Sequence, residues 1–322
     1  MNSIKLIKSL IGQVATASRP LTSPEVQLLR RNYSAAAYTT RYADYDHIQV
    51  TAPHDHVLHV ELNRPEKRNA LNRDMFREIH ACFQEIANDK QCRAVVISGS
   101  GSMFSAGIDY TDMMEMMTSV VSSDQPQRDD IAARAKFIRH MIVLLQNSFS
   151  SIAKCHKPTI AAVHSGCIGA GVDLITAADI RYASSDAYFS IREVSIGMAA
   201  DLGTLQRLPK IVGNDSLVRE LAFTGRDLGA KEAKEFGLIS GVFGSSENTI
   251  EGAIDLARSI ASRSPVAVQG TKVSLNYSRD HSEKDGLEFM QIWNMCMLQS
   301  EDLIKATTSV ATKQEAPEFA DL

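Results

Sequence analysis

The sequence predicts an α/β fold with parallel strand pairing, followed by a helical C-terminal region. Two observations lead to this prediction. Short apolar strand patterns alternate with helix patterns from about residue 56 to residue 245, an order that is typical of parallel sheets covered by helices. After Asn248 the pattern is helical almost to the end of the chain. No low-complexity linker separates the two parts, and we place a soft boundary near residue 250.

The first elements follow from local periodicity. Residues 56–62 alternate well enough for a strand, which Asn63, Arg64 and Pro65 end. Asn72 can cap a helix, because apolar residues recur after it with a 3.6-residue period. These residues are Met75, Phe76, Ile79, Cys82, Phe83 and Ile86.

The next elements are predicted in the same way. Residues 94–97 form a short apolar strand, and residues 122–130 are polar enough for a surface loop. A long helical pattern runs from residue 131 to residue 152, and Pro158 closes it. Residues 159–163 form another apolar strand, which leads into a glycine-rich turn.

Residues 1–33 differ from the rest of the chain. They carry five basic residues and one acid, with serines among apolar residues, which is typical of a mitochondrial transit peptide. Residues 31–34 resemble a matrix-protease cleavage site, so we expect the mitochondrial matrix. A flexible extension is the alternative, and a secretory signal would need an unbroken apolar core. Peroxisomal targeting is disfavoured because residues 319–322 lack a Ser-Lys-Leu signal.

Composition excludes several classes of protein. Hydrophobic residues make up 44% of the chain and charged residues 22%, which excludes a wholly disordered chain. No segment approaches the ~20 apolar residues of a membrane span. The formal charge is −4, and it becomes −8 without residues 1–33, so we expect no nucleic-acid partner. The five cysteines show no CxxC spacing and are expected to be reduced thiols.

Two short motifs are weak indicators of a ligand site. Gly99 and Gly101 begin a dinucleotide-binding pattern, but Phe104 stands where the third glycine is needed. The histidines of residues 54–59 lack an obvious fourth ligand for a metal ion, so a polar lead-in to a strand is the favoured interpretation. We therefore expect neither a nucleotide cofactor nor a metal ion.

Two turns of small residues are more informative. Residues 105–109 and residues 169–173 each follow a strand and precede a helical segment. Such turns expose backbone N–H groups, and two converging donors would form an oxyanion hole for a thioester oxygen. Close helix–strand packing is the alternative interpretation. The helical segment after the first turn carries a methionine run, which suits either a core or a pocket for a flexible chain. This run consists of Met113, Met114, Met116 and Met117.

Three acids accompany these turns. Asp173 begins the helix after the second turn, whereas Glu193 and Asp201 have mostly apolar or small neighbours. Burial raises the pKa of a carboxyl group, so such acids can exchange protons near neutral pH. A salt bridge or a helix cap is the alternative for each, above all for Asp173, because an acid near a helix N-terminus is favourable.

Taken together, these motifs resemble the crotonase (enoyl-CoA hydratase/isomerase) superfamily over about residues 48–310. The resemblance implies a spiral of ββα units with a C-terminal helical region that builds homotrimers or homohexamers. It divides the chain into 1–33 (transit peptide), 34–250 (α/β core) and 251–322 (helical trimerisation region). The segments that carry it are residues 62–72, 104–109, 157–164, 169–173, 178–182, 203–208, 224–226 and 232–233.

The resemblance also implies a substrate site for an acyl-CoA thioester. The N–H groups of Ile108 and Ala170 would form the oxyanion hole, although residue 170 is glycine in the usual family pattern. Coenzyme A would lie along residues 64–71 and 106–110, where Arg64, Lys67 and Arg68 would bind its phosphates. The expected substrate-binding residues are Ala106, Gly107, Ile108, Asp109, Tyr110 and Ala170.

Within the superfamily, the acids decide the reaction. The hydratases have a second Glu at the position of Asp173 and a Gly at that of Asp201, so both positions here resemble the dienoyl-CoA isomerases. This implies isomerisation of 3,5-dienoyl-CoA to 2,4-dienoyl-CoA in the β-oxidation of unsaturated acyl chains. Glu193 would be the base at C2, Asp201 the acid at C6, and Asp173 an assisting group.

Two alternatives to this activity stay open. One is a 2-enoyl-CoA hydratase of the same superfamily, and the other is a non-enzymatic relative that binds RNA or acts as a scaffold. The expected isomerisation transfers no electrons, so we expect no redox cofactor and no metal ion, with coenzyme A being part of the substrate. Acyl-chain length and the choice between trimer and hexamer do not follow from the sequence.

Overall fold

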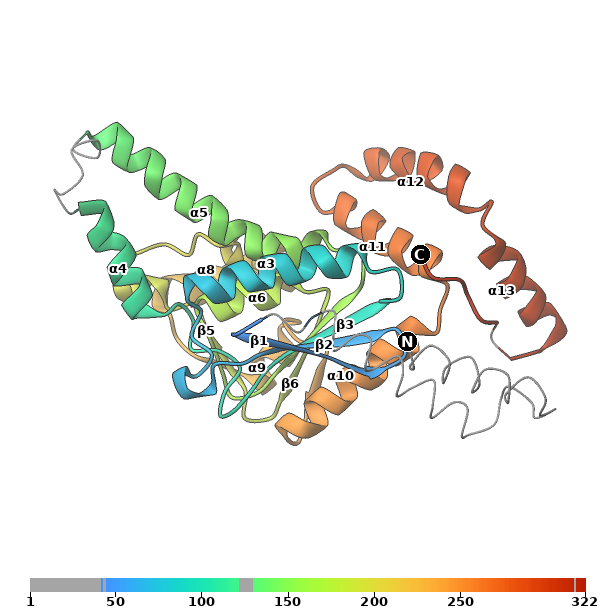
Figure 1. The fold of residues 1–322 in the computed structure, drawn as a ribbon, viewed down its shortest axis with the longest axis horizontal. Coiled ribbons are helices and arrows are strands. Elements are labelled where there is room, and N and C mark those ends of the chain that lie inside the picture. The colour runs from blue at the N-terminus through green and yellow to red at the C-terminus, as the bar shows by residue number, and fades with distance from the viewer. Residues whose placement is uncertain (1–41, 43–44, 122–129, 316) are drawn as a thin grey trace, which may run out of the picture.

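The computed structural model describes residues 42, 45–121, 130–315 and 317–322 (Figure 1). The predicted transit peptide of residues 1–33 lies outside the described residues. So does the predicted surface loop of residues 122–130, except for residue 130.

Within the described residues, the strands form two sheets. The larger sheet has the order β1-β2-β3-β4-β6-β9, in which β1 is antiparallel to β2 and every other pair is parallel. The smaller sheet has the order β5-β7-β8. The strands are β1 (Ile48–His54), β2 (Val57–Leu62), β3 (Ala94–Gly99), β4 (Thr159–Val163), β5 (Gly166–Ile168), β6 (Ile180–Ser184), β7 (Tyr188–Ser190), β8 (Leu228–Gly229) and β9 (Gly241–Phe243).

Consecutive strands join different sheets and are then followed by a helix. Strand β4 belongs to the larger sheet, β5 belongs to the smaller one, and α6 (Ala170–Ala177) follows. Strands β6 and β7 repeat this order and are followed by η3 (Glu193–Ile196) and α7 (Thr204–Val212). The predicted α/β fold with parallel pairing is therefore confirmed.

Helix α3 agrees with the sequence periodicity. Helix α3 begins after Asn72, whose side chain accepts a hydrogen bond from the N–H of Met75 at 3.0 Å, and its buried face consists of the six predicted residues. The other helices are η1 (Pro65–Lys67), α4 (Tyr110–Val121), α5 (Ile131–Lys154), α8 (Asp215–Thr224), α9 (Ala230–Glu235), α10 (Ser246–Ala261), α11 (Pro265–Ser278), α12 (Glu283–Met297) and α13 (Glu301–Thr312).

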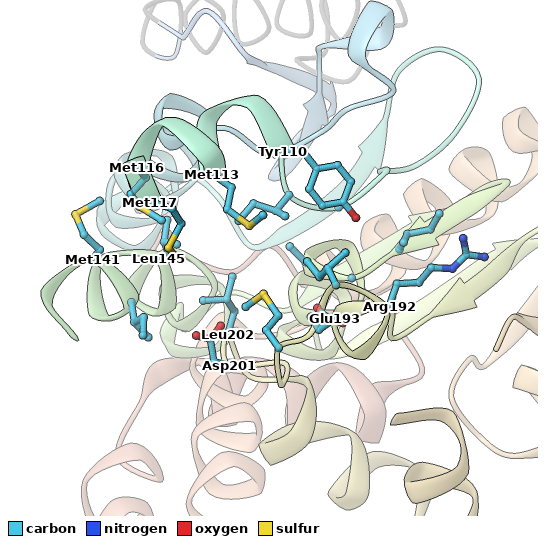
Figure 2. A pocket seen from close by; sticks show the side chains of 18 of the residues that line it. Tyr110, Met113, Met116, Met117, Met141, Leu145, Arg192, Glu193, Asp201 and Leu202 are labelled. Atoms are coloured by element: carbon cyan, nitrogen blue, oxygen red, sulfur yellow. The ribbon is translucent and has the colours of Figure 1, made fainter. Parts of the chain in front are cut away.

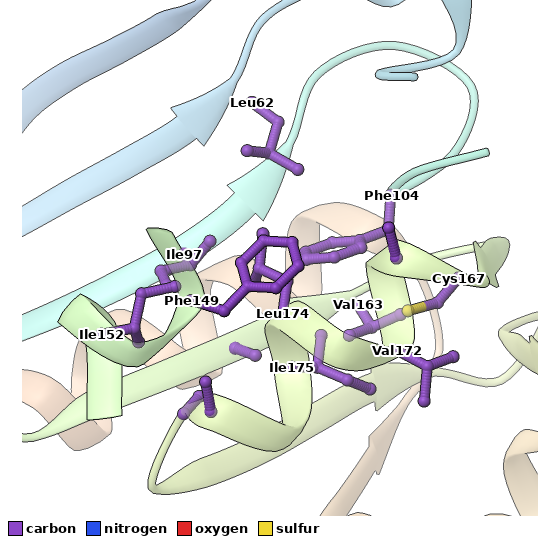
Figure 3. Packing of buried hydrophobic residues seen from close by; sticks show 14 of the residues in the cluster. Leu62, Ile97, Phe104, Phe149, Ile152, Val163, Cys167, Val172, Leu174 and Ile175 are labelled. Atoms are coloured by element: carbon purple, nitrogen blue, oxygen red, sulfur yellow. The ribbon is translucent and has the colours of Figure 1, made fainter. Parts of the chain in front are cut away.

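The central strands of the larger sheet, β3 and β4, are buried on both faces, as their continuously apolar sequences require. Alternate side chains of β3 point to opposite faces: Val95 and Ile97 join the main core, whereas Val96 packs with the alanines of α10 on the other face. Figure 3 shows how the main core continues from β3 to Phe149 and Ile152 of α5 and to the side chains of α6. The core therefore fixes α5 and α6 relative to the ends of the parallel strands.

The C-terminal helices divide into two groups. Helix α10 packs against the larger sheet, so the boundary expected near residue 250 falls within this helix. Helices α11, α12 and α13 extend to one side of the molecule, and α4 and the first half of α5 project on the opposite side (Figure 1). Within the described residues, no helix combines the length and the apolar character needed to cross a bilayer.

Candidate active site

One pocket brings together the two small-residue turns and two of the three predicted acids (Figure 2). One wall is apolar and comes from α4 and α5: Met113, Met116, Met117, Ile138, Met141, Ile142 and Leu145. The turns and the segment after β7 supply the rest: Ala106, Gly107, Ile108, Tyr110, Ile168, Gly169, Ala170, Arg192, Glu193, Ile196, Met198, Asp201 and Leu202. The pocket therefore combines an apolar channel with carboxylates and exposed backbone.

The two turns abut each other at the pocket. Gly107 has φ +91°, and a Cβ atom there would lie 2.8 Å from the carbonyl oxygen of Ile168 and 3.6 Å from the nitrogen of Ala170. Only glycine permits this approach with this backbone conformation. Within the described part of the chain, the N–H groups of Ile108 and Ala170 donate no hydrogen bond, although their neighbours do. Both N–H groups are thus free to bind an oxygen atom.

Glu193 lies directly against the second turn. A Cβ atom on Gly169 would be 3.3 Å from Oε1 of Glu193, so the carboxylate occupies the space that a side chain would fill. Its other oxygen, Oε2, is buried without a hydrogen-bond partner among the described residues. Burial, with a contribution from the charge of Asp173, raises the pKa of Glu193 to about 7. The group can therefore exchange a proton near neutral pH.

Asp173 lies beneath the pocket rather than in its wall. Its side chain is buried on α6, and Oδ1 accepts a 2.6 Å hydrogen bond from the N–H of Thr204, the first residue of α7. Burial raises the pKa of Asp173 to about 6, and the Thr204 amide opposes this rise. Asp173 thus satisfies the N-terminus of another helix while adding negative potential behind Glu193.

Asp201 lines the pocket on an irregular segment between η3 and α7. Burial raises the pKa of its carboxyl group above the ordinary value. Figure 2 shows Glu193 and Asp201 at separate places along the pocket, with Asp201 closer to the methionines of α4 and α5. The two acids can therefore act on different atoms of one extended ligand.

All but one of the predicted substrate-binding residues line the pocket. Ala106, Gly107, Ile108, Tyr110 and Ala170 line the pocket, as the resemblance implies. Asp109 is absent from the lining, because its side chain contacts Arg64 and the N–H of Thr111. Arg64 donates to this carboxylate and to the carbonyl of Ala70. Of the three basic residues expected at the phosphates, Lys67 and Arg68 are exposed and Arg64 is committed to internal contacts.

Sequence reasoning missed part of the site. No role in the pocket was predicted from the sequence for the α5 residues or for Arg192. The helical periodicity of residues 131–152 and the position of Arg192 next to Glu193 are the sequence signals that point to them. The histidines of residues 54–59 lie at and near the start of β2, where they make local hydrogen bonds. A ring nitrogen of His56 forms a hydrogen bond with the carbonyl of Gln91, and one of His59 forms a hydrogen bond with the hydroxyl of Ser98. Among the described residues, no three His, Cys, Asp or Glu side chains are grouped so that they could hold a metal ion.

Comparison with known proteins gives consistent results. A family model described as enoyl-CoA hydratase/isomerase matches residues 53–320. The chain is 52% identical to the mitochondrial Delta(3,5)-Delta(2,4)-dienoyl-CoA isomerase of Rattus norvegicus, over 85% of this chain and 82% of the relative. It is 42% identical to the peroxisomal protein of that name in Arabidopsis thaliana, over 83% of this chain and 93% of the relative.

A solved structure supports the same fold. The crystal structure of enoyl-CoA hydratase from Bacillus anthracis superimposes with a TM-score of 0.75 at 25% identity. The superposition covers 85% of this chain and 99% of that structure. The spiral arrangement of strands and helices is therefore shared with a solved protein.

Proposed function

Because the chain belongs to the enoyl-CoA hydratase/isomerase family, we propose that it is an isomerase that converts 3,5-dienoyl-CoA to 2,4-dienoyl-CoA in the oxidation of unsaturated acyl chains. The observation that carries this proposal is a pair of partly buried carboxyl groups with raised pKa values, Glu193 and Asp201, at separate places along one apolar pocket. The 52% identity to the rat isomerase supports it. A shift of two conjugated double bonds requires such a pair, because a proton leaves one carbon and another proton arrives four carbons away.

The reaction is balanced by two proton transfers. The Glu193 carboxylate removes a proton from C2, and the electron pair of that C–H bond forms the C1–C2 double bond of an enolate, whose negative charge lies on the thioester oxygen. When the thioester carbonyl re-forms, this pair becomes the C2–C3 double bond, the C3–C4 pair moves to C4–C5, and the C5–C6 pair takes a proton from the Asp201 carboxyl group at C6. The enzyme is left with a neutral Glu193 and an ionised Asp201, and exchange with solvent restores the starting state.

The negative charge that develops on the thioester oxygen needs its own stabilisation. The unpaired N–H groups of Ile108 and Ala170 would supply it, because preorganised donors in a buried site stabilise an enolate oxygen strongly. Alanine at position 170 keeps this N–H group. Asp173 would assist from below by fixing the N-terminus of α7 and by keeping the pKa of Glu193 high.

The pocket also suits the rest of the substrate. The apolar wall of α4 and α5 would pack against the acyl chain, and coenzyme A would extend past Ala106 and Tyr110 toward the exposed Lys67 and Arg68. Proton transfer alone completes the reaction, so the proposal includes no redox cofactor and no metal ion. The negatively charged chain makes a nucleic-acid partner an unfavourable alternative.

Assembly and location belong to the same proposal. Helices α11 to α13 expose large apolar side chains, which would be covered in a homotrimer or a homohexamer. Residues 1–33 would direct the chain to the mitochondrial matrix and would then be removed, leaving 34–250 as the α/β core and 251–322 as the helical assembly region. The mitochondrial rat relative supports this location, and the peroxisomal plant relative represents the alternative.

Isosteric substitutions test the two proton-transfer roles. Glu193→Gln and Asp201→Asn each remove one ionisable group with little change of shape. Each variant should lose roughly two or more orders of magnitude in the rate of 3,5-to-2,4 isomerisation, the usual scale of general acid–base catalysis. The rate is measured with purified protein from the growth of the longer-wavelength band of the 2,4-dienoyl product, whose double bonds are conjugated with the thioester. Near-normal activity in either variant would reject its assigned role.

A parallel assay with crotonyl-CoA separates the isomerase from the hydratase alternative. Hydration removes the enoyl absorbance, whereas the isomerase should act on the 3,5-diene much faster than it hydrates crotonyl-CoA. Faster hydration would replace the proposed reaction with that of a hydratase. Inactivity on both substrates, together with salt-dependent RNA binding, would support a non-enzymatic role.

A further inference from the structure

Asp201 stands on a segment that has no regular secondary structure, yet the proposed reaction requires its carboxyl group at one fixed place. The residues from 198 to 203 lie between η3 and α7 and form neither helix nor strand. A proton donor must reach its carbon atom within a narrow range of distance and angle, so the main chain beneath it has to be held.

Helix α5 holds this main chain through side-chain hydrogen bonds. The side-chain amide of Gln146 donates from Nε2 to the carbonyl oxygen of Asp201 at 2.7 Å. One helical turn later, the hydroxyl of Ser150 accepts from Nη2 of Arg207 at 3.3 Å, while Nη1 of the same guanidinium donates to the carbonyl of Leu202 at 3.2 Å. Two consecutive carbonyl groups are thus tied to one helix.

The same helix lines the acyl pocket. Met141, Ile142 and Leu145 precede Gln146 on α5 and line the proposed acyl channel. The contact from Gln146 to Asp201 therefore connects the wall against which the chain would pack with the segment that carries the proton donor. A shift of this segment by about 1 Å is enough to lower a catalytic rate by 10²-fold.

We propose that Gln146 is a positioning residue, which acts through the main chain of Asp201 to place its carboxyl group at C6 of the substrate. The inference rests on the isomerase function proposed above. It concerns Gln146 rather than Arg207, because the charge of Arg207 also acts on Asp173, so its removal would change two properties of the site. Gln146 is uncharged, and it reaches Asp201 through one hydrogen bond to the main-chain carbonyl.

The test separates proton removal at C2 from proton delivery at C6. Gln146→Met keeps the length of the side chain and removes the donor, and Gln146→Lys restores a donor of similar reach. Asn147→Met is the matched control, since Asn147 is exposed on the same turn of α5. Each variant is incubated with 3,5-dienoyl-CoA in D₂O, and both isomerisation and deuterium uptake at C2 are measured, with Tm as a check on folding.

Gln146→Met should isomerise about 10- to 100-fold more slowly than the wild type, with C2 exchange and KM changed less than about threefold. Gln146→Lys should recover part of the rate, and Asn147→Met should match the wild type. If Gln146→Met lost exchange and isomerisation equally, or kept the wild-type rate, the positioning role would be overturned. The proposed function would still be upheld in that case, provided that the wild type isomerises the substrate. A wild-type protein without either activity would overturn both.

Discussion

Burial of its carboxyl group, with the charge of Asp173 as a second cause, raises the pKa of Glu193. Its Oε2 atom is buried, and no described neighbour donates to it, so ionisation of this group costs more in the folded chain than in water. The proposed base is therefore a strong one for a carboxylate, because a higher pKa means a greater affinity for the proton it removes from C2. The environment that makes Glu193 reactive also makes its ionised form unfavourable to the fold.

This cost predicts a pH dependence of stability. The pKa of Glu193 is about 7 in the folded chain and near its ordinary value in the unfolded chain. Between these values the folded state binds more protons, so its contribution to stability is present at pH 5 and is lost as pH rises through 7. Glu193→Gln should therefore gain about 2 kcal/mol of unfolding free energy relative to wild type between pH 5 and pH 8.

Urea denaturation at fixed protein concentration measures this effect at both pH values. Asp173 titrates in a neighbouring range, but it is present in both proteins, so most of its contribution cancels in the comparison. An identical pH dependence in wild type and variant would show that Glu193 is not the source of the change.

Individual residues also show what the sequence could and could not predict. The apolar neighbours of Glu193 and Asp201 predicted raised pKa values, and burial in the structure raises both. The spacing of the acids did not reveal that Asp173 binds the N-terminus of α7, because Thr204 is 31 residues away. The orientation of the Asp109 side chain could not be predicted from its turn either, because it depends on a partner elsewhere in the chain, Arg64.

Helices with a strong hydrophobic periodicity could be predicted in detail. Helix α3 has the cap and the buried face that its sequence predicts, because an amphipathic helix encodes its own orientation toward the core. Helix α4 was predicted as a helix, but its partner in the pocket was not. The methionines of α4 line the same pocket as Met141, Ile142 and Leu145 of α5, and this convergence is a tertiary property that neither helix encodes alone.

The methionine wall predicts a role for α4 in substrate affinity. Met116 lines the pocket, and Met114, two positions earlier on the same helix, is exposed. Met116→Ala removes apolar contact with the proposed acyl chain, so KM for a long-chain dienoyl-CoA should rise about five- to tenfold with little change in kcat.

Met114→Ala is the control and should change KM less than twofold. Steady-state kinetics with short- and long-chain substrates make the comparison, and only the long-chain substrate should depend on Met116. Equal effects of the two substitutions would remove α4 from the binding of the acyl chain.

At the scale of the whole molecule, each of the helices α11, α12 and α13 exposes large apolar side chains. Leu287, Ile292 and Met295 of α12 are each more than half exposed, and further apolar side chains of α11 and α13 are exposed as well. In the proposed assembly another copy of the chain would cover these side chains.

A charge placed on this surface should disrupt the proposed oligomer. Ile292→Glu puts a carboxylate on the apolar face of α12, where burial in an interface would cost several kcal/mol. Light scattering should then give a mass close to that of one chain, whereas Lys284→Glu, an exposed substitution on the same helix, should leave the wild-type mass unchanged. A wild-type protein that already has the mass of a single chain would contradict the assembly.

The central claim is that Glu193 removes the proton from C2 and Asp201 delivers a proton to C6. Deuterium uptake tests this claim most directly. Wild type and the two amide variants are incubated with 3,5-dienoyl-CoA in D₂O, and mass spectrometry and NMR locate the deuterium. Asp201→Asn should still exchange the proton at C2 while losing isomerisation, and Glu193→Gln should lose both. Loss of C2 exchange in Asp201→Asn, with retention in Glu193→Gln, would reverse the two roles and contradict this account.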